Sequence, residues 1–263
     1  MRDVKRLDVL GAPADALTFD RALDAACQLA RDHSRTSFVV AVNPEKVMTA
    51  RADAGVNAFL HAADLVIPDG TGIVAAAKIL FGERIERVAG ADLMQAICAE
   101  SGKRGVKIFL YGSKEATSEA ADAELRKRYP DILLVGRENG YLPEEKFGEL
   151  VERINASGAD VLFLALGSPK QEKWMNRYAD ELDVGLCMGI GGTLDTIAGT
   201  VRRAPLSWQK ARCEWLYRLI RQPSRFWRQR RIFFFAARVL LARAAGTGRR
   251  ERRENRRARR TTR

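Results

Sequence analysis

Short runs of apolar residues recur along the first 200 residues of the chain, and segments with helical spacing separate them. Each run is near-continuously apolar, which is typical of a strand buried on both faces of a sheet. The runs predict six strands, over residues 37–42, 64–67, 106–111, 132–135, 161–166 and 184–188.

Two of the intervening segments carry clear helix signals. Residues 114–129 follow Ser113, a suitable N-cap, and end just before Pro130, while residues 144–156 follow Pro143. Alternating strands and helices favour a parallel sheet with right-handed crossovers. The sequence therefore predicts an α/β fold, a Rossmann-like parallel-sheet core.

The pattern changes near Val201, where arginines and aromatic residues become frequent. Two helical runs follow, separated by Pro223, and only polar, Arg-rich chain remains beyond Gly246. We therefore expect three parts: an α/β domain over 1–200, a helical basic appendage over 201–246, and a disordered tail over 247–263.

The formal net charge of +12 is unevenly distributed. Residues 200–263 hold 21 Lys and Arg against three acids, whereas the preceding residues hold 24 basic and 30 acidic side chains. The first 199 residues, here called the body, are thus mildly acidic and the C-terminal region is strongly basic. Such basic regions usually bind phosphate groups, in nucleic acid or in lipid headgroups.

Several classes of protein are disfavoured. The four cysteines are isolated, the N-terminal residues lack an apolar signal segment, and the longest apolar stretch, about 11 residues interrupted by Arg238, is shorter than the ~20 that span a bilayer. With two histidines there is no Ser-His or Cys-His pattern, and no Walker A loop or paired D-x-D is present. We expect a cytoplasmic protein, unless the basic tail attaches it to a membrane surface, and none of these patterns points to a metal site or a cofactor.

Polar residues follow the predicted strands at the ends where α/β proteins bind ligands. Asn43-Pro44-Glu45 follows the first strand, and Pro68-Asp69-Gly70-Thr71-Gly72 follows the second. Asn43 before Pro44 is also an ordinary helix start, and Pro-Asp-Gly is also turn chemistry. Because Asp69 lies at the end of a strand and opens a glycine-containing loop, its carboxylate is a candidate for catalysis.

Arg84 and Arg87 follow further along the chain, although a pair of solvated arginines is common on any surface.

Two glycine-containing segments are candidates for anion binding. Gly167-Ser168-Pro169-Lys170-Gln171 leads into a helix N-terminus, whose free N–H groups suit a phosphate, although Ser168 is equally a plain N-cap. Gly189-Ile190-Gly191-Gly192-Thr193 is a second glycine turn, with Asp195 close behind. It departs from the G-x-G-x-x-G fingerprint, so a nucleotide-dependent oxidoreductase fits poorly.

Taken together, and in their order along the chain, these segments resemble the WecG/TagA/CpsF glycosyltransferases (glycosyltransferase family 26) over about residues 35–231. The resemblance rests on the segments above, on Gly90 and Asp92, and on three C-terminal signatures: Arg203-Ala204-Pro205, Glu214-Trp215 and Pro223-x-Arg225. Members are bacterial enzymes of exopolysaccharide and teichoic-acid assembly. They transfer a sugar, such as N-acetylmannosamine, from a UDP donor to a polyprenyl-diphosphate-linked acceptor, with inversion and without metal.

The resemblance implies a role for each matching residue. Asp69 would be the catalytic base, Asn43 and Gln171 would orient the sugars, and Arg87 would contact phosphate or sugar. Arginines of the appendage would neutralise the donor diphosphate. The expected substrate-binding residues are Gly70, Thr71, Gly112, Ser113, Gly167, Ser168, Pro169, Lys170, Gly191, Gly192, Arg218, Arg225 and Arg228. One departure is Ala41, where the family often has Thr. A hydroxyl contact near the acceptor or donor sugar is therefore lost, and the sugar need not be the N-acetylmannosamine of better-known members.

The expected partners are a UDP-sugar donor, a polyprenyl-diphosphate-linked acceptor and an anionic membrane surface, at the inner face of the bacterial plasma membrane. Basic and aromatic residues mixed on short helices suit that interface, although about half of the aromatic residues at 226–227 and 233–235 are as well explained by core packing. The alternative is a nucleic-acid-binding protein that uses the basic tail. We expect no nucleic acid, because the body is acidic and the aromatic residues are not spaced for base stacking. The oligomeric state is left open.

Overall fold

The computed structural model describes residues 4–201, 204–205, 207–208, 217 and 226–246. Six parallel strands form its central sheet, in the order β4-β3-β8-β7-β5-β6. They are β3 (Ser37–Val42), β4 (Leu65–Pro68), β5 (Lys107–Gly112), β6 (Leu133–Glu138), β7 (Val161–Ala165) and β8 (Leu186–Gly189). All six predicted strands are confirmed, as is the Rossmann-like α/β fold.

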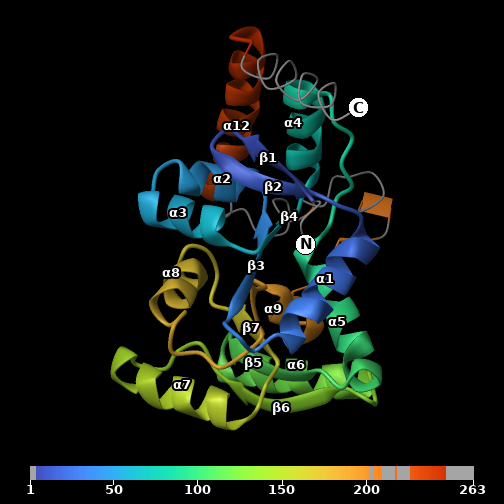
Figure 1. Ribbon diagram of the computed structural model, residues 1–263, viewed down its shortest axis with the longest axis vertical. Coiled ribbons are helices and arrows are strands. Elements are labelled where there is room, and N and C mark those ends of the chain that lie inside the picture. Colours follow the sequence, from blue (N-terminus) through green and yellow to red (C-terminus); the bar gives the residue numbers. More distant parts are fainter. Residues whose placement is uncertain (1–3, 202–203, 206, 209–216, 218–225, 247–263) are drawn as a thin grey trace.

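Helices cover both faces of this sheet (Figure 1). One face packs against α2 (Pro44–Ala50), α3 (Ala54–Ala62), α4 (Thr71–Phe81), α7 (Phe147–Ala156) and α8 (Lys170–Arg177). The other packs against α1 (Phe19–Arg31), α5 (Gly90–Arg104), α6 (Glu115–Arg128) and α9 (Thr193–Ile197). Successive strand residues point to opposite faces, so Val40 joins the first core and Val39 the second. Burial on both faces explains why the strands are continuously apolar.

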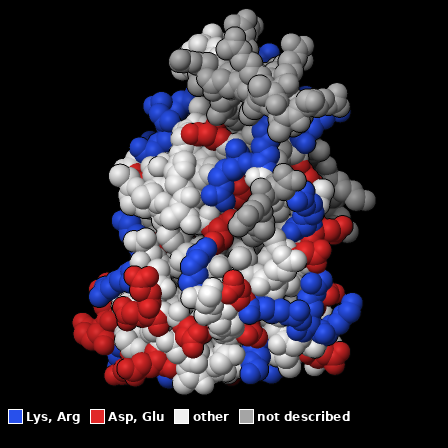
Figure 2. Space-filling view, in the orientation of Figure 1, with Lys and Arg blue, Asp and Glu red and all other residues white. Residues whose placement is uncertain are grey.

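The two helices that the sequence predicts in detail are also confirmed. Residues 114–129 contain α6, and residues 144–156 contain a short 3-10 helix, η1 (Glu144–Lys146), followed by α7. Figure 2 shows acidic side chains gathered at the end of the molecule where α7 lies, while basic side chains are spread over the whole of this face.

The sequence did not predict an N-terminal hairpin, β1 (Lys5–Val9) paired antiparallel with β2 (Ala12–Ala16). Leu10 and Gly11 turn the chain with φ of 58° and 90°, a left-handed pair typical of two-residue hairpin loops. A bidentate ion pair then ties the strands together, because Arg6 donates to both carboxylate oxygens of Asp15 at 2.7 and 2.9 Å.

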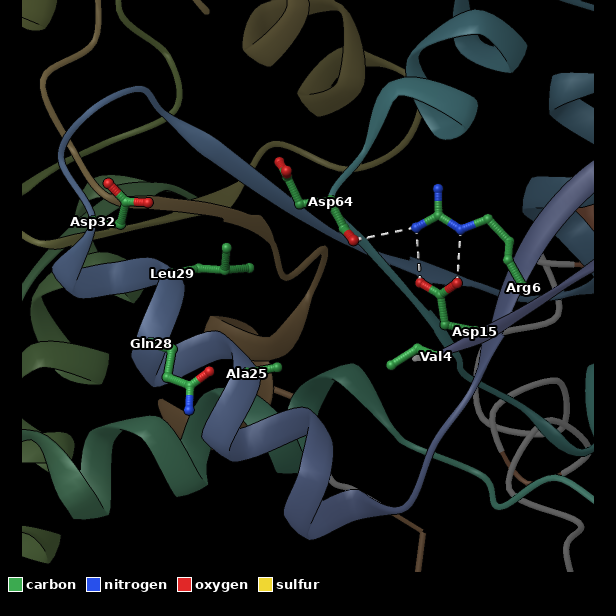
Figure 3. A pocket seen from close by; sticks show the side chains of 8 residues that line it. All are labelled: Val4, Arg6, Asp15, Ala25, Gln28, Leu29, Asp32 and Asp64. Atoms are coloured by element: carbon green, nitrogen blue, oxygen red, sulfur yellow. Dashed lines mark hydrogen bonds and ion pairs between the residues drawn. The ribbon is translucent and has the colours of Figure 1, made fainter. Parts of the chain in front are cut away.

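This ion pair lines a small hollow of about 490 Å³ between the hairpin and α1 (Figure 3). Arg6 also donates to the carbonyl oxygen of Asp64, and Asp15 accepts a hydrogen bond from the backbone N–H of Val66 at 2.7 Å. These polar groups satisfy one another, and their hydrogen bonds join the hairpin to β4 and to the residue before it.

The C-terminal helix α12 (Phe226–Ala244) packs on α2 and α4 (Figure 1). Its inner side buries Phe235 and Val239, each 3% exposed, in the core that covers one face of the sheet. Arg231 donates to Thr49 Oγ1 at 2.7 Å and Arg243 donates to the carbonyl oxygen of Ile79. No helix in the described part of the chain is both long and apolar enough to span a membrane.

Candidate active site

A cleft of about 1760 Å³ opens at the carboxyl ends of the six parallel strands. Residues that follow each strand line it, as expected for an α/β sheet. It brings together twelve of the residues that the sequence singles out: Asn43, Asp69, Gly70, Thr71, Arg87, Ser113, Gly167, Ser168, Lys170, Gln171, Gly191 and Gly192.

Five further candidates are placed differently or are not described. Gly112 and Pro169 adjoin lining residues but do not themselves line the cleft. Arg218 and Arg225 lie outside the described residues, as do Arg203, Glu214, Trp215 and Pro223. Arg228 falls in α12, where only its place in the helix is described.

Asn43 lies between β3 and α2 and is the N-cap of that helix. Its side-chain oxygen accepts a 2.9 Å hydrogen bond from the backbone N–H of Lys46, and Pro44 occupies the first turn of α2. The capping role that the sequence predicts for Asn43 is therefore confirmed. It commits the amide oxygen of Asn43 to the helix, so the amide nitrogen is the end that remains suited to bind a ligand.

Asp69 and Arg87 meet at the end of β4. Arg87 Nη2 lies 3.9 Å from Asp69 Oδ1, and both side chains are about 30% exposed, at 31% and 28%. Backbone hydrogen bonds fix this corner, since the N–H of Asp69 donates to the carbonyl of Val42 at 2.8 Å and that of Val88 to the carbonyl of Pro68 at 3.1 Å. A carboxylate and a guanidinium are thus held together at the cleft wall.

Two small residues, Gly90 and Ala41, lie near this carboxylate. A Cβ atom placed on Gly90 would lie 3.0 Å from the Cβ of Ala41 and 3.8 Å from Asp69 Oδ2. The alanine that departs from the resembled family therefore lies beside the acidic residue, and both line the cleft.

Gln171 is buried, with only 3% of the residue exposed. Its Oε1 accepts from the backbone N–H of Gly191 at 3.2 Å, and its Nε2 donates to Glu172 Oε1 at 3.1 Å. A Cβ on Gly189 would lie 2.3 Å from Gln171 Nε2, so only glycine fits under this amide. Gln171 therefore links the start of α8 to the loop between β8 and α9.

Glu172 also forms a buried ion pair with Lys46, whose Nζ lies 2.5 Å from Glu172 Oε1. Burial opposes ionisation of this carboxyl, but the ammonium of Lys46 and neighbouring polar groups outweigh burial and lower its pKa. Ser168 contributes to this lowering, although within the described residues neither its Oγ nor Glu172 Oε2 makes a hydrogen bond of ordinary geometry.

The turn after β5 is tightly built. Gly112 has φ of 131°, and a Cβ there would lie 2.5 Å from the carbonyl carbon of Ala165 on the next strand. Ser113 follows with a left-handed φ of 59°, its N–H donates to the carbonyl of Ala165 at 3.1 Å, and it lines the cleft. Gly112 therefore does not line the cleft itself, but its backbone conformation positions Ser113, which does.

Helix N-termini converge on the cleft. Four helices of eight or more residues begin there without a side-chain cap, namely α4, α5, α6 and α8. Their first N–H groups and the positive ends of their dipoles face the cleft, an arrangement that favours anionic ligands. Lys114 and Lys170 add positive charge at the start of α6 and α8.

Sequence reasoning missed several lining residues. Lys46 pairs with a residue 126 positions away, a partnership that no local pattern reveals. Tyr141, which is 72% exposed, follows β6 and would have been found by extending the strand-end rule to that strand. Tyr217 and Ile232 reach the cleft from the C-terminal region. Among described residues, no three His, Cys, Asp or Glu side chains are grouped so as to hold a metal ion.

The sequence matches the "Glycosyl transferase WecG/TagA/CpsF family" over residues 7–249, nearly the whole chain. That range contains every strand of the sheet and all the cleft residues described above. The chain therefore belongs to the WecG/TagA/CpsF glycosyltransferase family, and it is a glycosyltransferase of cell-surface glycan synthesis.

Proposed function

We propose that this glycosyltransferase moves a hexose or N-acetylhexosamine from a UDP donor to a polyprenyl-diphosphate-linked saccharide, with inversion and without metal. The observation that carries the proposal is the position of Asp69. This carboxylate lies on the cleft wall beside Arg87, and helices without a side-chain cap begin in the same cleft. A base and an anion site in one cleft are what transfer from a nucleotide sugar requires.

In the proposed reaction, Asp69 accepts the proton of the acceptor hydroxyl as that oxygen attacks the anomeric carbon. The bond between the anomeric carbon and the UDP oxygen breaks, and UDP leaves with the electron pair. A single displacement from the face opposite UDP inverts the anomeric configuration. General base catalysis of this kind contributes about 10²–10⁴-fold to the rate.

The leaving diphosphate gains charge as the bond breaks, so it needs preorganised positive groups. The N-termini of α4, α5 and α8 and the side chain of Lys170 supply them in the described cleft. We propose that Arg218, Arg225 and Arg228 add guanidinium groups from the C-terminal region, since planar forks match diphosphate oxygens. Arg87 contacts phosphate or sugar from its place beside Asp69.

The sugars are oriented by Asn43 and Gln171. Asn43 offers its amide nitrogen, because its oxygen caps α2. Ala41 and Asp69 both lie next to Gly90 and line the cleft, and Ala41 lacks the hydroxyl that a threonine would place there. We therefore propose that the donor or acceptor sugar differs, at the position facing Ala41, from that of relatives with threonine.

A lipid-linked acceptor requires the enzyme to work at a membrane surface. Phe233, Phe234, Leu240 and Leu241, here called the outer apolar face of α12, are 58–69% exposed and lie opposite the buried Phe235 side of the helix. Exposed arginines at 230 and 238 accompany them. Apolar residues bordered by arginine suit an anionic membrane interface. We propose that this face binds the inner surface of the bacterial plasma membrane.

The test of the function is a transfer assay with a panel of UDP-sugars and a short-chain polyprenyl-diphosphate saccharide, with and without EDTA. Acceptor-dependent release of UDP and a lengthened, inverted glycan support the proposal. UDP release that ignores the acceptor, or transfer that EDTA abolishes, contradicts it. A gel shift with RNA and DNA at physiological salt tests the alternative of nucleic-acid binding through the basic tail.

A further inference from the structure

The ion pair between Lys46 and Glu172 has no part in the bond-making steps above. Their side chains are 7% and 0% exposed, and 2.5 Å separates Nζ from Oε1. Burying two charges is costly, and well-packed apolar residues often replace such a pair without loss of stability. Stability alone therefore gives a weak reason for charges at this place.

A continuous chain of contacts begins at this pair. Glu172 Oε1 accepts from Lys46 and also from Gln171 Nε2, and Gln171 Oε1 accepts from the backbone N–H of Gly191. An amide has one donor end and one acceptor end. Fixing the nitrogen of Gln171 on Glu172 therefore directs its oxygen to Gly191.

Both ends of this chain lie on the cleft. The backbone N–H of Lys46 is the group that Asn43 caps, and Gly191 precedes the turn into α9. α2 follows β3, α8 follows β7, and β8 lies between those two strands. The contacts thus cross three neighbouring strand ends, joining the Asn43 turn to the glycine loop of residues 189–192.

We propose, on the basis of the sugar transfer put forward above, that Lys46 and Glu172 are positioning residues. Lys46 fixes the carboxylate of Glu172, which holds the amide of Gln171 in one orientation. Gln171 in turn sets the glycine loop relative to Asn43. Neither charged residue touches the reacting atoms. A misplacement of about 1 Å at a reacting centre can cost roughly 100-fold in rate, so this support matters for turnover.

Two double variants separate positioning from charge burial. Lys46→Met with Glu172→Gln removes both charges and keeps a hydrogen-bond acceptor for Gln171. Lys46→Met with Glu172→Leu removes both charges and the acceptor. We expect the Gln double variant to keep kcat within about fivefold of the parent and the Leu double variant to lose about 10- to 100-fold, with a smaller change in KM for the UDP-sugar.

Amide hydrogen exchange supplies a readout that does not depend on turnover. The N–H of Gly191 donates to Gln171, so exchange in a peptide covering 189–193 should be faster in the Leu double variant and near the parent rate in the Gln double variant. If the parent enzyme transfers no sugar, the proposed function fails while exchange still decides the positioning chain. If the Leu double variant does not fold, Glu172→Asp, which shortens the acceptor side chain, is expected to show the same losses.

Asp15→Asn is the matched control, because Asp15 is a buried carboxylate paired with Arg6 (Figure 3), and neither residue lines the cleft. It should lower the melting temperature and leave both kcat and loop exchange unchanged below that temperature. A Leu double variant with parental kcat and parental exchange would overturn the proposal, since the pair would then serve folding only.

Discussion

The outer apolar face of α12 leads to a quantitative prediction about membrane binding. Phe233, Phe234, Leu240 and Leu241 keep 63%, 58%, 61% and 69% of their surface exposed. Fully burying such a side chain contributes about 1.5–3 kcal/mol, so inserting the exposed parts of all four contributes roughly 4–7 kcal/mol. Even about half of the lower figure, ~2 kcal/mol, corresponds to a roughly 30-fold change in partitioning.

The perturbation is replacement of all four residues by serine, measured by flotation with vesicles that contain anionic lipid. We expect at least a 30-fold weaker partition coefficient, with turnover retained on a soluble short-chain acceptor because the buried Phe235 side of α12 is untouched. The control is Leu133→Ser with Val135→Ser, two partly exposed residues on the edge strand β6, which should bind vesicles like the parent. Undiminished flotation of the fourfold variant would refute the reasoning.

Three further predictions concern packing, the glycine loop and pH. Phe235→Ala removes a 3%-exposed ring between α12 and the core and should cost about 3–5 kcal/mol in the free energy of unfolding by urea titration; a cost under about 1 kcal/mol would show that α12 is loosely attached. Gly189→Ala places a Cβ 2.3 Å from Gln171 Nε2 and should lower kcat at least about tenfold, whereas Gly148→Ala, with open space around it in α7, should leave kcat unchanged; equal activities would contradict the packing argument. Because the folded pKa of Glu172 lies below its unfolded value of 4.5, its contribution to stability is present above pH 4.5 and is lost as the pH falls through the lower folded value. Glu172→Gln should therefore flatten the acid side of the stability curve measured by urea unfolding, and an unchanged curve would contradict the shift.

The sheet was predictable because each strand is buried on both faces and carries its own apolar signal. The hairpin was not, since β2 reads Ala-Pro-Ala-Asp-Ala and lacks the branched residues that mark a strand. Its stability depends on the pairing of Asp15 with Arg6 and on its contact with β4, interactions that no local pattern contains.

The site was predictable to the extent that it follows strand ends. Asn43, Asp69 and Ser168 were found because polar residues directly follow apolar runs, and the cleft gathers them. The link between Lys46 and Glu172 was not foreseeable, because 126 residues separate the partners and each is ordinary in its own helix. Local sequence thus revealed many of the residues that line the cleft, and only the fold revealed the remaining ones and the contacts that hold them.

The central claim is that Asp69 acts as the base in sugar transfer, and one comparison tests it most directly. UDP affinity by titration calorimetry and acceptor-dependent UDP release are measured for the parent and for Asp69→Asn, which keeps the size of the side chain. The account predicts a UDP dissociation constant within about threefold of the parent and a fall in kcat of about 10²–10⁴-fold. An Asp69→Asn enzyme that binds UDP and transfers sugar at the parental rate would contradict it.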